Sequence, residues 1–131
     1  MSEENVEIIQ GLYEAVNAQR WGTSWDLYDP DYEMDPRDTG IGVTRGIEAA
    51  EETLRDYWET FEKFQVELKE VIHADNGQVV TAVRDGGRLK GSDTEVWNRF
   101  FHVWSFENGK IVRLSIHTER NRALEAAGLS E

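Results

Sequence analysis

The feature that most constrains the fold is the stretch Val96–Phe106, VWNRFFHVWSF, which is rich in aromatic side chains. Read as a β-strand of period two, it carries His102 and Trp104 on its even-numbered face and Phe101 and Val103 on its odd-numbered face. Neither face is polar, so the strand needs apolar cover on both sides. It therefore lies between two layers of one domain, or between the domain and a partner.

The size and charge of the chain limit what it can do. Its 131 residues suit a single domain spanning 1–131, and a content of 39% hydrophobic and 11% aromatic residues is too high for a disordered chain. The formal net charge of -12 argues against nucleic acid or a membrane surface as a partner, because both require a basic patch. With no cysteine, an acidic N-terminus and no apolar run long enough for a bilayer, we expect a cytoplasmic protein.

The apolar periodicity predicts helices first and strands afterwards. The first half is expected to contain helices over 3–18, 24–28 and 47–61, with a short strand over 32–35. The second half is expected to contain strands over 64–73, 79–84, 96–106 and 110–118, with Gly86 and Gly87 in a connection, and a last helix over 122–127. This order indicates an α+β domain in which a curved antiparallel sheet and helices enclose a pocket.

The two faces of this sheet are predicted to have different roles. The even face of the aromatic strand joins Leu114 and Ile116 of the last strand and points toward the helices, whereas the odd face points toward a second copy or solvent. The residues expected to contact a ligand in the pocket are Trp58, Asn98, Phe100, Trp104, Leu114 and Ile116.

Several segments of the chain resemble a known group of proteins. These segments are YEAVNAQ, DYEMDP, RDYW, FHVWSFENGKIV and ALEAAGL, and they resemble the SnoaL-like branch of the NTF2-like superfamily. The resemblance implies a cone, in which a strongly curved sheet wraps around N-terminal helices with an internal apolar pocket, and a homodimer formed through the outer face of the sheet. It is a weak guide to function, because the superfamily includes isomerases, cyclases, epoxide hydrolases, dehydratases and non-enzymatic binders.

Within that superfamily, ketosteroid isomerase is locally the most similar. The resemblance implies that Asp35, directly followed by Pro36, is a catalytic base and that Tyr13 donates a hydrogen bond to an oxyanion. His102 stands where that enzyme has a protonated aspartate, and Trp58 stands where it has a tyrosine. The oxyanion hole is therefore not reproduced, although an imidazole at His102 can also donate a hydrogen bond to an enolate oxygen.

Each of these residues also has a purely structural interpretation. Asp35 can simply end a strand before a proline, Tyr13 can pack its ring in the core, and His102 can be a satisfied core histidine. His73 and His117 are expected at the surface or an interface. The three histidines lie on separate strands without paired spacing, so no metal site is expected. No other cofactor is expected either.

Two other activities of the superfamily match less well. In the cyclase relatives an acid/base residue lies near the end of the last strand, where Ile116 and His117 offer no carboxylate. In epoxide hydrolases an Asp-Arg-Asp arrangement polarises water, but Arg99 is followed two residues later by Phe101. The leading hypothesis is binding of a small lipophilic, carbonyl-bearing molecule with isomerase or cyclase-like acid/base activity. The alternative is a non-catalytic ligand-binding or dimerisation domain.

Overall fold

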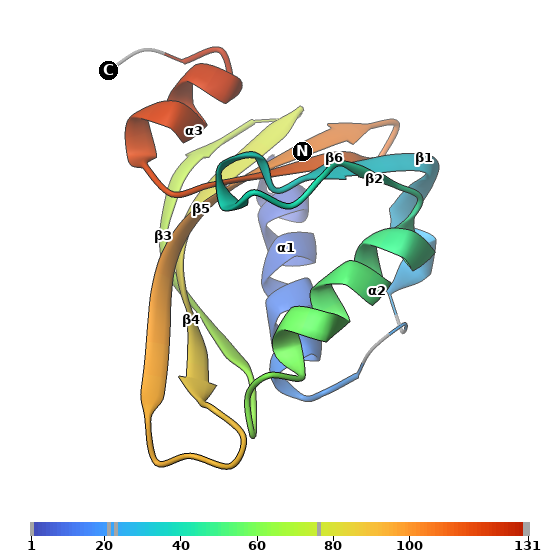
Figure 1. Cartoon of the computed structure of the whole chain (residues 1–131). Helices are drawn as coiled ribbons and strands as arrows, with labels where there is room; N and C mark the ends of the chain where they lie inside the picture. The colour runs from blue at the N-terminus through green and yellow to red at the C-terminus, as the bar shows by residue number, and fades with distance from the viewer. Residues whose placement is uncertain (1, 21, 23, 76, 130–131) are drawn as a thin grey trace.

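The computed structural model describes residues 2–20, 22, 24–75 and 77–129, which form helices packed on one curved sheet (Figure 1). In chain order the elements are α1 (Ser2–Asn17), the 3-10 turn η1 (Trp25–Leu27), β1 (Tyr28–Asp35), the 3-10 turn η2 (Arg37–Thr39), β2 (Thr44–Arg45), α2 (Ile47–Trp58), β3 (Gln65–Ala74), β4 (Gln78–Arg88), β5 (Glu95–Glu107), β6 (Lys110–His117) and α3 (Arg120–Ala126). The predicted α+β class and strongly curved sheet are confirmed.

The strands form one sheet in the order β2-β1-β6-β5-β4-β3. The predicted antiparallel meander is present from β3 to β6. The sheet is mixed rather than purely antiparallel, because β1 runs parallel to β6, with Met34 beside Leu114. A parallel pair needs a long crossover connection. Here α2 and the meander carry the chain to the far edge of the sheet and back to β1.

Helices α1 and α2 cover the concave face of the sheet, and α3 lies on the opposite face (Figure 1). The α1 stripe predicted from the sequence turns Ile9, Leu12 and Tyr13 into the core. The end of α1 is tied to β3 by two hydrogen bonds, in which Asn17 Nδ2 donates to the Val66 carbonyl at 2.9 Å and Val66 N–H donates to Asn17 Oδ1 at 2.7 Å. This contact fixes α1 across the concave face.

The outer face of the sheet is partly covered by the chain itself. Phe101 and Val103, on the odd face of β5, form a second buried cluster with Val80, Ala82 and Ala123 of α3. These two apolar residues of β5, expected to face a second copy or solvent, are thus buried by the C-terminal helix of the same chain. Homodimerisation through the remainder of this face stays a prediction.

Strand β4 is longer than the sequence predicted, because Gly86 and Gly87 continue it instead of ending it. Their φ angles are 142° and 145°, a region that other residues rarely adopt. A Cβ on Gly86 would lie 2.0 Å from the carbonyl oxygen of Val96, and a Cβ on Gly87 would lie 2.8 Å from that of Lys63. Glycines at both positions let neighbouring backbones approach closely where the sheet bends.

Two short elements also differ from expectation. The helix predicted over 24–28 is a single 3-10 turn, and the following strand begins at Tyr28 rather than at Tyr32.

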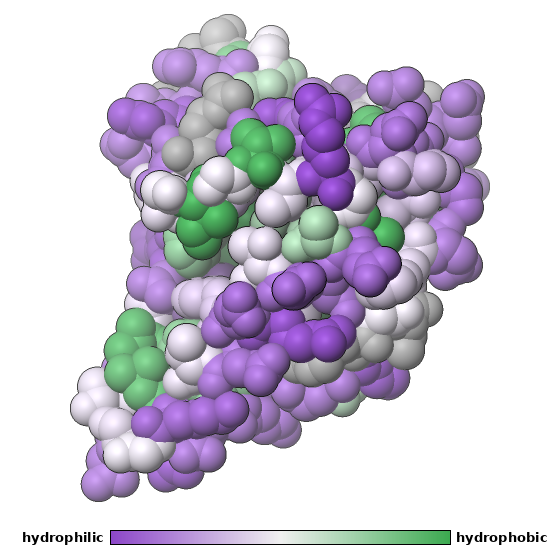
Figure 2. All heavy atoms as spheres, turned by 45° about the vertical axis from the view of Figure 1, so that its right-hand side comes forward, coloured by the Kyte–Doolittle hydropathy of each residue, from purple (hydrophilic) through white to green (hydrophobic). Residues whose placement is uncertain are grey.

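No helix within the described residues is both long enough and apolar enough to span a membrane. Figure 2 shows a largely hydrophilic surface around α2, interrupted by a few small hydrophobic patches.

Candidate functional site

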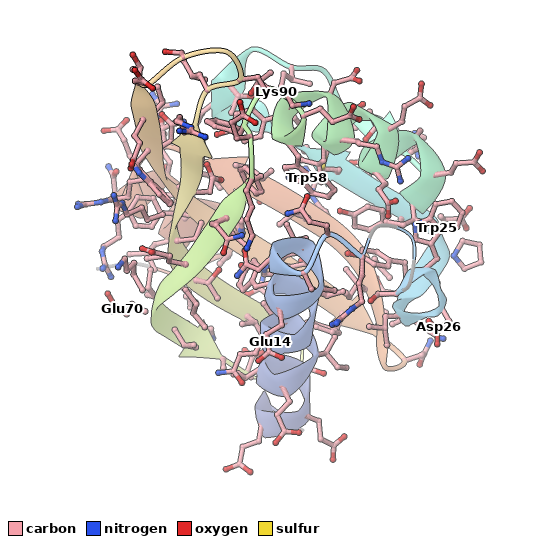
Figure 3. All side chains as sticks on the ribbon, turned by 90° about the horizontal axis from the view of Figure 1, so that it is seen from below. Glu14, Trp25, Asp26, Trp58, Glu70 and Lys90 are labelled. Atoms are coloured by element: carbon pink, nitrogen blue, oxygen red, sulfur yellow. The ribbon has the colours of Figure 1, made fainter. Side chains whose placement is uncertain are left out.

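A cavity of about 360 Å³ lies between α1, α2 and the concave face of the sheet. Figure 3 views the molecule from below, with Trp58 near the centre and Asp26 and Glu70 toward the periphery. Most of the cavity wall is apolar, and its main apolar residues are Leu12, Val16, Met34, Leu54, Trp58, Phe64, Val66, Phe100, Trp104, Leu114 and Ile116. An apolar cavity of this size with a few polar groups is typical of small-molecule sites, which span roughly 300–1,000 Å³.

Most of the predicted pocket residues lie at this cavity. Tyr13, His102 and the predicted ligand contacts other than Asn98 line it. The side chain of Asn98 instead supports a wall residue, because its Nδ2 donates a hydrogen bond to the hydroxyl oxygen of Tyr57 at 3.0 Å. The structure thus brings Tyr13 and His102 together, as the sequence led us to expect.

Asp35 does not join them, so its expected position as a base in the pocket is corrected. It lies beside Ser115 of β6, whereas the flanking β6 residues Leu114 and Ile116 line the cavity. Its carboxylate faces the outside of the sheet, where Arg113 Nη2 donates to Asp35 Oδ2 at 2.7 Å. Neighbouring residues on a strand point to opposite faces. The segment was therefore identified correctly, but Met34 rather than Asp35 reaches the cavity.

His117 was predicted at the surface or an interface, but it is buried within the chain, with an exposed fraction of 2%. Its Nε2 lies 2.9 Å from Ser115 Oγ, and its Nδ1 lies 3.3 Å from Asp38 Oδ2. Arg122 of α3 donates to the other oxygen of Asp38 at 3.0 Å. These contacts anchor α3 and η2 to the outer face, so His117 has a structural role there.

A carboxyl group that sequence reasoning missed, Asp85, lies at the cavity. Its exposed fraction is 6%, and Tyr57 Oη donates a hydrogen bond to its Oδ1 at 2.7 Å. Among the described residues, no Lys, Arg or His forms an ion pair with it. Burial raises the pKa of Asp85 from 3.8 to about 6, although the hydrogen bond from Tyr57 acts in the opposite direction.

The sequence does contain a signal for Asp85. Strand β4 alternates strictly, so Val79, Thr81 and Val83 share one buried face with Asp85. A carboxylate that continues an apolar stripe belongs in the core or at a cavity. This signal was missed because the strand was expected to end at residue 84.

The cavity contains a second carboxylate, Glu51 of α2, but its donors are already in place. It accepts hydrogen bonds from Gly22 N–H at 3.1 Å, from Trp25 Nε1 at 2.6 Å and from Arg55 Nη2 at 2.6 Å. Three donors, one of them cationic, occupy the carboxyl oxygens of Glu51, which fastens Trp25 to α2. Asp85 is therefore the better candidate for proton transfer.

The polar groups around His102 form a closed cluster. The hydroxyl oxygen of Tyr13 lies 2.8 Å from Thr81 Oγ1 and 2.8 Å from His102 Nδ1, and it accepts a hydrogen bond from Trp104 Nε1 at 3.1 Å. Burial lowers the pKa of His102 to about 3, with a smaller contribution from His117, and burial raises the pKa of Tyr13 above its usual value. Both side chains are consequently neutral at physiological pH.

The cavity thus has two polar ends, at His102 and at Asp85. His102 lies beside Thr81 of β4, and Thr81 and Asp85 lie four residues apart on that strand, which corresponds to ~13 Å. One end offers a carboxyl group that can exchange a proton near neutral pH, and the other offers an uncharged imidazole. Among the described residues, no group of three or more His, Cys, Asp or Glu side chains is placed to hold a metal ion.

Comparisons with known proteins agree with this architecture. Residues 9–114 match the model of the SnoaL-like domain family. Bal32a, from a soil-derived mobile gene cassette, is 23% identical, with 95% of this chain and 96% of that chain covered and a TM-score of 0.77. TerC, co-crystallised with polyporic acid, is 19% identical, with coverages of 92% and 95% and a TM-score of 0.72.

An LEH-like epoxide hydrolase from M. tuberculosis is 17% identical, with 90% of this chain and 80% of that chain covered and a TM-score of 0.71. Among curated proteins, none matches the chain significantly. These low identities establish a shared fold, whereas the family match extends over most of the sequence. The chain therefore belongs to the SnoaL-like domain family and has the NTF2-like fold of its structural neighbours.

Proposed function

We propose that this protein binds a small lipophilic, carbonyl-bearing molecule in its cavity and that Asp85 transfers a proton on the bound molecule. One observation carries the proposal: a buried carboxyl group lines an apolar cavity and pairs with no cation among the described residues. Burial raises the pKa of Asp85 to about 6, which is close to the operating pH that favours a general acid or base.

The chemistry follows from the two ends of the cavity. The Asp85 carboxylate removes a proton from a carbon activated by the carbonyl, and the bonding electrons move onto the carbonyl oxygen. His102 donates a hydrogen bond to this oxygen as negative charge develops on it. Return of the same proton from Asp85 to a different carbon completes an isomerisation without a co-reactant.

The separation of the two ends favours a conjugated substrate. Asp85 and His102 extend from strand positions ~13 Å apart. A ligand that contacts both therefore has several bonds between the carbon that loses the proton and the carbonyl oxygen. Conjugation lets the charge move over those bonds, as in an enone or a quinone. Among proteins of this fold, the co-crystallisation of TerC with polyporic acid and the epoxide hydrolase activity of another relative support a small-molecule ligand.

The experiment measures hydrogen exchange on bound ketones. Hydrophobic enones and ketones are screened for binding through the fluorescence of Trp58 and Trp104, and bound probes are followed by NMR for deuterium incorporation in D2O. We expect Asp85→Asn to slow exchange at least about 100-fold while retaining binding, because a positioned general base contributes typically 10²–10⁴-fold. The wild-type rate should rise with pH and level off above about 6, as Asp85 ionises.

Asp35→Asn is the matched control, because it makes the same chemical change on the opposite face of the sheet. Exchange by this variant should stay within about threefold of the wild-type rate. Equal rates in wild type and Asp85→Asn would contradict the proposed base. Tight binding without exchange in the wild type would favour the alternative, a protein that only stores or senses its ligand.

We also propose a homodimer through the outer face of the sheet. Support comes from the part of this face that α3 leaves uncovered, where the guanidinium of Arg84 lies 4.1 Å from the ring centroid of the partly exposed Trp97. Light scattering after gel filtration tests the proposal. Trp97→Asp should shift the mass toward the monomer, whereas Val43→Asp, at a side chain 52% exposed elsewhere, should not. A monomeric wild type would contradict it.

A further inference from the structure

The hydroxyl group of Tyr13 is a junction of three hydrogen bonds. Its oxygen contacts Trp104 Nε1 at 3.1 Å, Thr81 Oγ1 at 2.8 Å and His102 Nδ1 at 2.8 Å. A tyrosine hydroxyl has one proton to donate and two lone pairs that accept. The three neighbours use all of this capacity, so Tyr13 has nothing left to offer a ligand.

The available protons allow two sets of hydrogen-bond directions around the Tyr13 hydroxyl group. The Trp104 indole can only donate, so it occupies one lone pair of Tyr13. In the first arrangement Thr81 donates to Tyr13, and Tyr13 donates to His102 Nδ1. In the second, His102 Nδ1 carries a proton and donates to Tyr13, and Tyr13 donates to Thr81.

The environment of Thr81 distinguishes the two arrangements. Its exposed fraction is 0%, and it does not line the cavity. Among the described residues, Tyr13 is the hydrogen-bond partner of its hydroxyl group. The second arrangement would therefore bury the hydroxyl proton of Thr81 without an acceptor, which is costly. The first arrangement gives the hydroxyl protons of Thr81 and Tyr13 and the indole proton of Trp104 an acceptor each, and it is favoured.

The first arrangement fixes the state of His102. Burial keeps the imidazole neutral by lowering its pKa to about 3, so the ring carries a single proton. Since Nδ1 accepts from Tyr13, this proton is on Nε2. Among the described residues Nε2 has no hydrogen-bond partner, and it is not fully enclosed by protein, so it faces the cavity that His102 lines.

We propose that Thr81, acting through Tyr13, holds His102 in the Nε2–H tautomer and so restricts this end of the cavity to a ligand atom that accepts a hydrogen bond, such as a ketone or quinone oxygen. The inference rests on the proposed function in taking the cavity as a ligand site. Thr81 and Tyr13 are positioning residues, because neither offers a donor to the ligand. A ligand group that can only donate would place its own hydrogen against the Nε2–H of His102, and such a ligand would bind less well.

The first test reads the tautomer directly in the ligand-free protein. Nitrogen-15 spectra of histidine-labelled protein distinguish a protonated ring nitrogen from an unprotonated one, and a His102→Gln variant identifies the His102 signals. The inference predicts that Nδ1 is unprotonated and Nε2 is protonated. A proton on Nδ1 would overturn it, whatever the cavity binds.

The second test compares Thr81→Val, which keeps the shape but removes the hydroxyl group, with Thr81→Ser, which keeps the hydroxyl group. In Thr81→Val a lone pair of Tyr13 becomes free, so His102 Nδ1 can donate and the Nδ1–H tautomer should become populated. Thr81→Ser should retain the wild-type tautomer. An unchanged tautomer in Thr81→Val would show that Thr81 does not fix it.

The third test uses three tricyclic probes of similar shape: fluorenone, which only accepts, carbazole, which donates through N–H, and fluorene, which does neither. Wild type and Thr81→Ser should bind fluorenone about tenfold more tightly than carbazole, and Thr81→Val should lose most of this preference. Equal affinities in the wild type would overturn the proposed selectivity. If no probe binds although Nε2 is protonated, the tautomer assignment stands, and the ligand-binding function and its selectivity fail.

Discussion

Two aspartates of the same sheet, Asp35 and Asp85, are nearly equally buried but have different surroundings. Their exposed fractions are 5% and 6%. Asp35 points to the outer face and forms an ion pair with Arg113 at 2.7 Å. Asp85 points to the cavity, where its donor is the uncharged hydroxyl group of Tyr57 at 2.7 Å. Burial alone does not make a carboxylate a proton carrier. The two sites differ in the charge of the group that contacts the carboxylate, a guanidinium at Asp35 and a neutral hydroxyl group at Asp85.

The difference also separates the two faces by role. On the outer face, Arg113 contacts both Asp35 and Glu33, and Arg122 contacts Asp38, so opposite charges fasten β6 to β1 and α3 to η2. On the strands that face the cavity, His102 is neutral at physiological pH, and Asp85 becomes neutral below about pH 6. The ion pairs of the outer face therefore stabilise the fold, whereas the buried carboxyl group of Asp85 lowers stability and is available for proton transfer.

The largest expected effect is a rise in stability when the cavity aspartate loses its charge. The carboxyl group of Asp85 ionises near pH 3.8 when unfolded and near 6 when folded, so its contribution to stability falls as pH rises between these values. A difference of about two pKa units corresponds to about 3 kcal/mol at high pH. Asp85→Asn should therefore gain up to about 3 kcal/mol in urea unfolding at pH 8, and the gain should shrink toward zero near pH 4.

Asp35→Asn should change the free energy of unfolding in the opposite direction. The substitution removes the negative charge that faces Arg113, so we expect a loss of about 1–2 kcal/mol at pH 8. Equal losses in both variants would mean that the two sites do not differ as described.

A loss of similar size is expected when the cation of the outer face is removed. Arg113→Met leaves the carboxylate of Asp35 buried without this partner, which should cost about 2 kcal/mol. A double-mutant cycle with Asp35→Asn should give a coupling energy of about 1 kcal/mol or more. Ligand binding in the cavity should not change. Simple additivity of the two substitutions would argue against the ion pair.

The smallest effect concerns the hydroxyl group of Tyr57. Because its hydrogen bond lowers the pKa of Asp85, Tyr57→Phe should raise that pKa further and reduce stability at pH 8 by about 1 kcal/mol. Carboxyl NMR and urea unfolding measure the two quantities. Tyr28→Phe is the control, since no described residue hydrogen-bonds its hydroxyl group. A fall in the pKa of Asp85 in Tyr57→Phe would contradict the assignment.

The periodicity of the sequence was sufficient for most of the fold. The α1 stripe, the meander from β3 to β6 and the inward face of His102, Trp104 and Ile116 all followed from local patterns. The parallel pairing of β1 with β6 did not, because it depends on contacts between segments far apart in the chain. Asp35 was expected in the cavity because Asp35-Pro36 resembles the base of ketosteroid isomerase, whereas Met34 is the residue of this segment that lines it.

Other features depended on tertiary contacts that no local pattern reports. Gly86 and Gly87 are typical of a turn, yet they continue β4. Glycine is needed at both positions because a Cβ atom there would clash with the backbone of a neighbouring segment. Because the strand was expected to end at residue 84, Asp85 was not predicted to lie on it. The role of His117 depends on Asp38, which is distant in sequence and is brought to it by the fold.

The most direct test of the account is a carboxyl carbon-13 titration of Asp85 in the ligand-free wild-type protein, assigned with Asp85→Asn. We predict a midpoint near pH 6, raised by burial in the cavity, and a further rise in Tyr57→Phe. A midpoint close to 3.8 would mean that the carboxylate is solvated or paired with a cation. Asp85 would then lack the property on which the proposed proton transfer depends.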